Sequence, residues 1–202
     1  MAEKSKESLF SFKRSDINSQ IDETKKLIKL CDLYEQQIRF PNYSRLELHL
    51  NAVESWKFYY QMNIFDLKLT DLSIIVFNYS KIPFLSFSYI QCPYIVDEEG
   101  EIDWDSEPEE PLLLRYDLDE FAYNEYIHPA SHLHIGDNNI RFGLKRILNP
   151  ISFTLLVIRQ IYPNTWKIFL TKCDEKSFFH IRKNLFLIPE SLYNFERELY
   201  LE

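Results

Sequence analysis

Three of the five histidines in this 202-residue chain fall within seven residues, at His128, His132 and His134. The unperturbed pKa of imidazole lies close to physiological pH, so a histidine ring can serve as an acid, a base or a metal ligand. Two such rings beside a phosphodiester can cleave it, because one removes a proton while the other protonates the leaving oxygen. These three residues are therefore the first candidates for catalysis.

A cation and a carboxylate precede the histidines in residues 112–118, where apolar and polar residues alternate. Successive side chains of an extended strand point to opposite faces of a sheet, so Arg115 and Asp117 share one face. By the same rule His132 and His134 share one face of the next expected strand. If the two strands pair, we expect these four side chains to converge, with Asp117 orienting an imidazole.

His128 lies directly before a proline, which disfavours the helical backbone region and predicts an extended approach to the strand. We expect its ring to face the same site as His132 and His134. Arg115 and Arg141 are then the candidates to stabilise the negative charge of a phosphate. Two further cations follow closely and are candidates for substrate binding, namely Lys145 and Arg146.

A metal site is the first alternative, in which His132 and His134 bind a divalent ion such as Zn²⁺ together with His128 or Asp117. Catalytic zinc sites commonly use three protein ligands and leave one position open. The second alternative is structural, with histidines that hydrogen-bond neighbouring carboxylates and fix a loop without reacting. The sequence leaves the three interpretations open, and acid–base catalysis, unlike the metal site, needs no cofactor.

The charge of the chain argues against unspecific binding to nucleic acids. Its 31 acidic residues outnumber the 23 Lys and Arg residues, and the formal net charge is -8. The mean field therefore repels polyanions, while the basic residues after the histidines form a local exception. These basic residues leave a specific contact with RNA possible despite the negative net charge.

The cysteines indicate a reducing compartment. Cys31, Cys92 and Cys173 are widely separated and form neither a disulfide framework nor a zinc ribbon. No apolar stretch reaches the length of a membrane span, and the polar N-terminus lacks the apolar segment of a signal peptide. We therefore expect a cytoplasmic protein that makes no contact with a membrane.

Acidic residues are concentrated in residues 97–111, which also contain glycine and proline. This composition predicts a solvated loop that is inserted into the surrounding fold. Trp104 lies in the loop and is a candidate contact for a protein partner, because tryptophan is common at interfaces. The alternative is that its ring folds back onto its own domain.

The hydrophobic pattern predicts a single α+β domain over residues 1–202, with a flexible N-terminus at residues 1–14. Its centre is a mainly antiparallel meander of about six strands. The strands are expected at residues 64–69, 73–79, 84–91, 112–118, 131–135 and 140–143, with another at 166–171. Helices are expected at residues 15–39, 44–60, 150–162 and 189–200. In the third strand Ser86 and Ser88 alternate with apolar residues, which gives one face small hydroxyl groups.

Four segments carry a resemblance, and they are Phe87–Pro93, Leu114–Asp117, His128–Gly136 and Asn149–Phe153. In this order they resemble an uncharacterised bacterial family, a domain of unknown function, and the histidine segment is the most specific of them. The resemblance spans residues 64–163 and implies no particular reaction. More remotely, an Arg-Tyr-Asp strand followed by closely spaced histidines is similar to small bacterial toxin–antitoxin proteins suspected of acting on RNA.

Two hypotheses about function follow. In the first, the chain is a bacterial defence or toxin–antitoxin protein that cleaves RNA or another phosphodiester without a metal, using His128, His132 and His134 as acid–base groups. In the second, it is a non-enzymatic subunit of a defence complex that binds a protein partner through its acidic loop, with charge complementarity steering the encounter.

Overall fold

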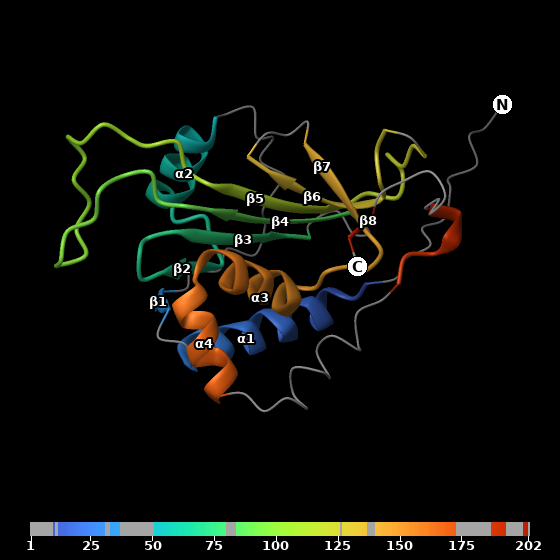
Figure 1. The fold of residues 1–202 in the computed structure, drawn as a ribbon, viewed down its shortest axis with the longest axis horizontal. Coiled ribbons are helices and arrows are strands. Elements are labelled where there is room, and N and C mark those ends of the chain that lie inside the picture. Colours follow the sequence, from blue (N-terminus) through green and yellow to red (C-terminus); the bar gives the residue numbers. More distant parts are fainter. Residues whose placement is uncertain are drawn as a thin grey trace.

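Eight strands form one sheet in the described part of this computed structural model (Figure 1). Their bounds are β1 Tyr34–Gln36, β2 Leu67–Leu69, β3 Ile74–Asn78, β4 Leu85–Ile90, β5 Leu113–Leu118, β6 Ser131–Ile135, β7 Arg141–Leu144 and β8 Tyr200–Leu201. The order of the strands in the sheet is their order in the chain. Neighbours from β1 to β7 run antiparallel, and β8 pairs in parallel with β7. The predicted α+β fold around an antiparallel meander is therefore confirmed.

Helices lie on both sides of the sheet. Their bounds are α1 Arg14–Leu30, α2 Ala52–Gln61, α3 Pro150–Ile161 and α4 Pro163–Lys172, with a short 3₁₀ helix, η1, at Glu190–Leu192. On one side lie α1, α3 and α4, and on the other lies α2 (Figure 1). The structure describes residues 10, 12–30, 33–36, 51–79, 84–125, 127–136, 140–172, 187–192, 200 and 201. Among these residues, no helix combines the length and apolar character needed to cross a bilayer.

The start of α3 lies where the sequence predicted a helix, at residue 150. The Asn149 side chain accepts a hydrogen bond from the amide of Ser152 at 2.8 Å, and the Ser152 hydroxyl accepts one from the Asn149 amide at 2.8 Å. Pro150 takes the first helical position, where its missing N–H leaves no hydrogen bond unmade. As predicted, the helix stops just before Pro163, which in turn opens α4.

The predicted strand at residues 166–171 is wrong, because these residues belong to α4. The alternation of Trp166, Ile168 and Leu170 resembles a strand, yet Ile168 and Leu170 are exposed. Phe169 is buried instead, and its ring stacks with that of Trp166 at a centroid distance of 5.1 Å. Residues three apart share a helix face, so the helical pairing decides the local structure.

The N-terminal helix is shorter than predicted. It ends at Leu30 rather than near residue 39, because residues 34–36 join the sheet as β1. The second helix begins at Ala52, after Asn51 caps it by accepting a hydrogen bond from the amide of Glu54 at 2.8 Å. Residues 44–50 of that predicted helix lie outside the described residues, as do residues 1–9 of the predicted flexible N-terminus.

The predicted terminal helix at residues 189–200 also differs. Its described beginning is the 3₁₀ helix η1, and Tyr200 belongs to β8, which pairs with Gly143 of β7. Residues 193–199 lie outside the described residues. At Tyr200 pairing with the edge strand β7 therefore decides the local structure, because tertiary contacts often outweigh helical propensity.

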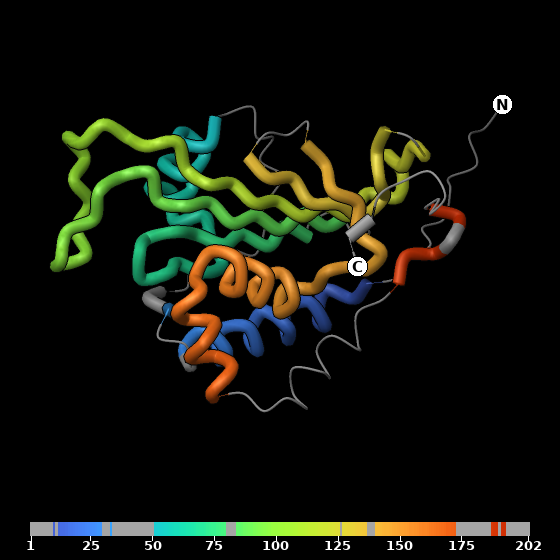
Figure 2. The backbone as a smooth tube through the Cα atoms, in the orientation of Figure 1, coloured from blue at the N-terminus to red at the C-terminus, as the bar shows by residue number. Residues whose placement is uncertain are grey.

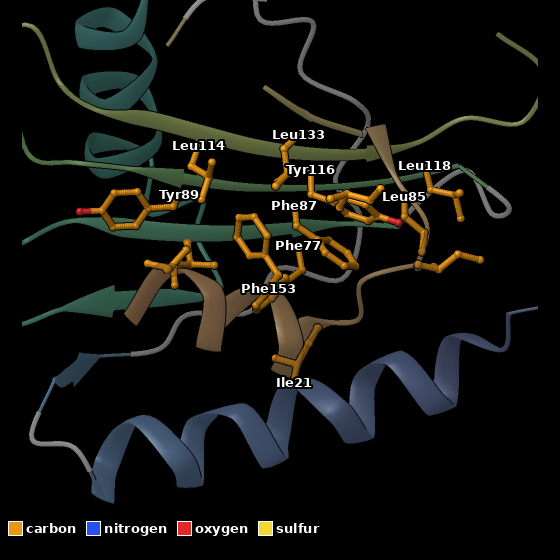
Figure 3. Close-up of a cluster of buried hydrophobic side chains, with 14 of the residues drawn as sticks. Ile21, Phe77, Leu85, Phe87, Tyr89, Leu114, Tyr116, Leu118, Leu133 and Phe153 are labelled. Carbon is orange, nitrogen blue, oxygen red and sulfur yellow. The ribbon is translucent and has the colours of Figure 1, made fainter. Parts of the chain in front are cut away.

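The main hydrophobic core lies between the sheet and helices α1 and α3 (Figure 3). Phe77, Phe87 and Phe153 are fully buried there and meet edge to face, with ring centroids 5.3 to 6.4 Å apart. Tyr116 of β5 and Leu133 of β6 extend the same apolar face. Because strand side chains alternate, this packing turns the intervening polar residues of β4, β5 and β6 toward the opposite face.

A second hydrophobic cluster covers one end of that opposite face. Trp56 and Tyr59 of α2 pack there on strand residues, namely Ile74, Val76, Ile90 and Leu113. The acidic loop leaves the sheet at this same end, whereas the loop at residues 119–130 leaves it at the other end (Figure 2). Helix α2 therefore covers the part of the face next to the acidic loop, and the polar strand residues lie farther along.

Candidate functional site

Strands β5 and β6 place four polar side chains next to one another, as predicted. Arg115 lies opposite His134, and Asp117 lies opposite His132. All four belong to the sheet face that is turned away from α1 and α3. The ring of His128, which precedes β6, lies 4.7 Å from that of His132 between centroids. We call Arg115, Asp117, His128, His132 and His134 the histidine cluster.

The carboxylate of Asp117 lies at the centre of the cluster. Its Oδ2 atom accepts a hydrogen bond from Nε of Arg115 at 2.9 Å. The same oxygen lies 3.3 Å from Nε2 of His134 and 3.9 Å from Nε2 of His132. The last distance is too long for a hydrogen bond. One oxygen therefore faces a guanidinium and two imidazoles.

The members of the cluster differ in their access to solvent. His132 is 1% exposed, His134 is 2% exposed and Asp117 is 6% exposed, whereas His128 is half-buried. A bulky substrate can therefore reach His128 more readily than the two strand histidines. The cluster therefore has a buried part, Asp117, His132 and His134, and a more accessible imidazole, that of His128.

Backbone contacts fix the tautomer of His132. Its Nδ1 lies 2.7 Å from the carbonyl oxygen of Pro129. A carbonyl oxygen only accepts hydrogen bonds, so Nδ1 carries the proton and donates. In the neutral ring Nε2 then carries a lone pair, and this lone pair faces the Asp117 carboxylate without a proton between them.

Burial and neighbouring charges shift the pKa values of the cluster. Burial raises the pKa of Asp117, but the hydrogen bond from His134 and a neighbouring guanidinium outweigh this effect and lower it to about 2. Burial lowers the pKa of His132 to about 4, against the charge of Asp117. The pKa of His128 is also lowered, first by burial and then by the charge of Arg141. At neutral pH Asp117 is thus ionised, and His128 and His132 are uncharged.

His128 is held by its backbone in the loop between β5 and β6. Its amide donates to the carbonyl of Asn124 at 2.9 Å, and its carbonyl accepts from the amide of Asn124 at 2.9 Å. This two-hydrogen-bond bridge closes a short turn and leaves the imidazole directed at the strands. The predicted extended approach through Pro129 therefore brings His128 to the cluster.

The other predicted cations occupy different places. Arg141 of β7 lies opposite His134 and acts electrostatically on His128, so it flanks the cluster. Lys145 and Arg146 follow β7, and their main chains accept hydrogen bonds from the amide of Ile188 at 3.0 Å and the hydroxyl of Ser131 at 3.1 Å. These backbone contacts fasten the end of β7. We keep Arg115 and Arg141 as the cations of the candidate site.

Unsatisfied polar atoms gather around the cluster. Among the described residues, buried side-chain atoms without a hydrogen-bond partner include Oδ1 of Asp117, Nδ1 of His128, Nδ1 of His134 and Nε of Arg141. Buried polar atoms are satisfied in most proteins, because an unpaired group loses its hydration without compensation. Their concentration at one place is typical of a site that binds something.

Three members of the cluster also meet the requirements for a metal site. Asp117, His132 and His134 each offer one ligand atom, and these atoms all lie within 4.8 Å of one another. The sequence predicted His132 and His134 as ligands with either His128 or Asp117 as the third. The arrangement of the atoms favours Asp117 as the third ligand.

Two contributors to the site were not singled out as site residues from the sequence. Ser86 of β4 lies opposite Asp117 and helps to hold the pKa of that carboxyl low by hydrogen bonding. The carbonyl of Pro129 sets the tautomer of His132. The alternating serines of β4 were a usable signal for Ser86, but a main-chain carbonyl leaves no mark in the sequence.

Trp104 of the acidic loop folds back onto its own domain. Its ring lies 5.2 Å from that of Tyr94, 6.3 Å from that of Trp56 and 6.3 Å from that of Tyr60, between centroids. The Nζ atom of Lys57 lies 5.8 Å from the Trp104 ring. The indole is still 45% exposed. It therefore anchors the acidic loop to α2 and also presents a surface to solvent.

The fold and the cluster define an α+β protein whose antiparallel sheet is apolar on one face and carries a histidine-rich polar site on the other. Residues 21–196 match the DUF2290 family of uncharacterised conserved proteins, and the chain belongs to this family. No match was found among curated proteins or among solved structures. The predicted membership of a family of unknown function is thereby confirmed.

Proposed function

We propose that the chain is an enzyme that cleaves phosphodiester bonds, with RNA as the substrate class and the histidine cluster as its catalytic centre. The observation that carries this proposal is the gathering of three imidazoles, one carboxylate and the guanidinium of Arg115 on one sheet face, flanked by Arg141. Proton transfer and the stabilisation of phosphate charge need these groups together.

His128 is the residue that exchanges protons with the substrate, because its ring is uncharged at neutral pH and the most accessible of the three. It accepts the proton of a ribose hydroxyl, whose oxygen attacks the phosphorus. The imidazolium then returns the proton to the leaving oxygen as the phosphorus–oxygen bond breaks. Arg141 stabilises the negative charge that develops on the phosphate.

The distribution of charge agrees with an anionic substrate despite the overall charge of -8. The acidic loop leaves the sheet just before β5, whereas Asp117 is the fifth residue of this strand (Figure 1). At about 3.3 Å per residue, Leu113 and Asp117 are about 13 Å apart, which exceeds the Debye length at physiological salt. The carboxylates of the loop therefore lie more than a Debye length from Asp117 along the strand.

Cleavage of a fluorescent RNA by the purified full-length chain tests the proposal. Replacing the proton-transfer group in His128→Gln should lower the rate by about 10²–10⁴-fold. Arg141→Gln should lower it by about 10²-fold, because one charge-stabilising donor is lost. Arg159→Gln is the matched control, since Arg159 is exposed on α3 on the other side of the sheet. A folded wild-type chain that leaves RNA intact, or full activity of His128→Gln, would contradict the proposal.

In the cell we assign this activity to bacterial defence or a toxin–antitoxin pair. The support is the likeness of the Arg-Tyr-Asp strand and its closely spaced histidines to such proteins. Induced expression of the wild-type chain in a bacterial host should arrest growth and degrade RNA, whereas expression of His128→Gln at the same level should do neither. Equal growth of the two cultures would remove this assignment.

Binding of a basic protein partner through the acidic loop is a second candidate function. The observation that favours it is that Trp104 anchors the acidic loop to α2. The anchored loop carries exposed carboxylates. Replacing Glu98, Glu99 and Glu101 by glutamine should abolish co-purification of the partner, while Glu23→Gln, at an exposed position of α1, should not. Unchanged co-purification by the loop variant would count against this function.

A further inference from the structure

We propose that Asp117, His132 and His134 form a binding site for one divalent transition-metal ion, with Zn²⁺ as the favoured ion. The proposal concerns the buried part of the histidine cluster. Its catalytic consequence rests on the function proposed above, whereas the binding itself does not. Three independent observations support it, and they are the spacing of the ligand atoms, the tautomer of His132 and the unpartnered atoms around the carboxylate.

The spacing of the atoms suits a metal ion. Ligands about 2.1 Å from a tetrahedral Zn²⁺ lie about 3.4 Å from each other. The distance from Oδ2 of Asp117 to Nε2 of His134 is 3.3 Å, and that to Nε2 of His132 is 3.9 Å. His134 donates a hydrogen bond from Nε2 to Asp117 without a metal, so on metal binding this proton would move to the unpartnered Nδ1 of His134. All three ligand atoms lie within 4.8 Å of one another, so small side-chain movements would complete the set. Strand residues supply all three ligands, so the backbone already holds them in place.

The tautomer of His132 supplies the second observation. Histidines that bind metals usually donate the other ring N–H to a carbonyl or carboxylate, which orients the ring. Nδ1 of His132 makes this hydrogen bond to the carbonyl of Pro129 at 2.7 Å. The Nε2 lone pair then points at an anionic oxygen, and a cation between the two atoms would turn this repulsion into attraction.

The carboxylate supplies the third observation. Asp117 is 6% exposed, and its Oδ1 has no hydrogen-bond partner. Its Oδ2 receives a hydrogen bond from Arg115, which matches the outer partners that orient metal-binding carboxylates. A buried anionic group with free acceptor capacity therefore faces the two imidazoles.

The ligand types select the class of ion. Imidazole nitrogen suits Zn²⁺, Fe²⁺ and Cu²⁺, whereas Mg²⁺ and Ca²⁺ prefer oxygen ligands. Three protein ligands leave at least one position of the ion for a water molecule or a phosphate oxygen. A dication next to Arg115 and Arg141 gives the site a net positive charge, which suits a phosphate rather than a neutral substrate.

Titration of the chelator-treated full chain with Zn²⁺ tests the proposal. Calorimetry should show one Zn²⁺ per folded chain, and equivalent Mg²⁺ should not bind. Zn²⁺ should raise the melting temperature of the wild type, because it binds the folded chain preferentially. Asp117→Asn and His134→Gln should each weaken binding by more than about 100-fold, since even outer partners contribute 10–100-fold. His128→Gln is the matched histidine control and should bind Zn²⁺ like the wild type.

A second measurement does not depend on the stability of these variants. In long-range ¹H–¹⁵N spectra of the wild-type histidine rings, Zn²⁺ should shift Nε2 of His132 and His134 while Nδ1 of His132 keeps its proton. No stoichiometric Zn²⁺ uptake, or uptake with unchanged spectra of these two rings, would overturn the metal site.

The two proposals fail separately. Zn²⁺ binding without RNA cleavage would remove the proposed function and leave the metal site in place. RNA cleavage that survives chelation in a chain without Zn²⁺ affinity would remove the metal site and leave the proposed function in place.

Discussion

The two faces of strands β5 and β6 are both buried, yet they bury opposite kinds of side chain. Toward α1 and α3 the strands present Leu114, Tyr116 and Leu133 (Figure 3). On the other face they present charged and titratable groups such as Asp117 and His132. Alternation in a pleated strand produces both faces from one short sequence.

The faces differ most in how completely their polar atoms are satisfied. On the apolar face the hydroxyl of Tyr116 accepts a hydrogen bond from the amide of Leu148 and lies within hydrogen-bond distance of the Ser131 hydroxyl, each at 3.2 Å. On the polar face Oδ1 of Asp117 and Nδ1 of His134 have no partner. Proteins accept such local costs at functional sites. One face therefore stabilises the fold, and the other holds groups ready for a ligand.

The largest expected effect on stability comes from the apolar face. Phe153→Ala removes a ring that packs against both Phe77 and Phe87. The cavity should lower the free energy of unfolding by about 3–5 kcal/mol. Urea denaturation followed by circular dichroism measures this loss, and a loss below about 1 kcal/mol would contradict the assigned core.

On the polar face a single substitution should cost more than a double one. Asp117→Leu leaves the guanidinium of Arg115 without its carboxylate and should lower the free energy of unfolding by about 3 kcal/mol. Adding Arg115→Met removes the stranded charge and should restore most of the stability. Urea denaturation of both variants without metal tests this, and equal losses would contradict the expected rescue by Arg115→Met.

High pH should weaken the packing of the apolar face. Burial raises the pKa of Tyr89 to about 12, and burial also raises that of Tyr116. Because the folded-state pKa exceeds the unfolded value of 10, stability is complete below pH 10 and falls as pH rises through about 12. Each such tyrosine contributes a slope of about 1.4 kcal/mol per pH unit in this window. Melting temperatures of the wild type and Tyr89→Phe between pH 9 and 12 measure the slope, which the variant should reduce.

The smallest effect should come from the far end of the polar face. Trp104→Ala removes the contacts of the indole with Tyr94 and Trp56, which should cost about 1 kcal/mol. The acidic loop should become more sensitive to protease while the histidine cluster is unaffected. Limited proteolysis detects this change, and equal cleavage of variant and wild type would show that Trp104 does not anchor the loop.

Local signals made most of the fold predictable from sequence. Alternation identified β5 and β6, and the helix expected at residues 150–162 is α3 at Pro150–Ile161. Alternation gave a wrong prediction at α4, where Trp166, Ile168 and Leu170 alternate as in a strand. Trp166 instead stacks with Phe169 on one face of the helix. Short apolar runs fit both periods, and only contacts with the rest of the chain decide between them.

The members of the histidine cluster were predictable from the sequence, whereas their chemistry was not. Strand alternation placed Asp117, His132 and His134 on one face, and the register of β5 and β6 agrees. Burial separated these three from His128, and this separation depends on the packing of distant segments. The tautomer of His132 depends on the position of a main-chain carbonyl, which no side-chain pattern encodes.

The order of the strands in the sheet has a consequence for how the chain folds. Because sheet order equals chain order, β5, β6 and β7 close through neighbouring segments, and residues 115–141 contain the histidine cluster and Arg141. Short loops lose little entropy on closure and form early. The packing of α1 against α3 joins distant parts of the chain and comes later. We expect the imidazoles to meet before the two helices dock, so the site assembles on a partly folded chain.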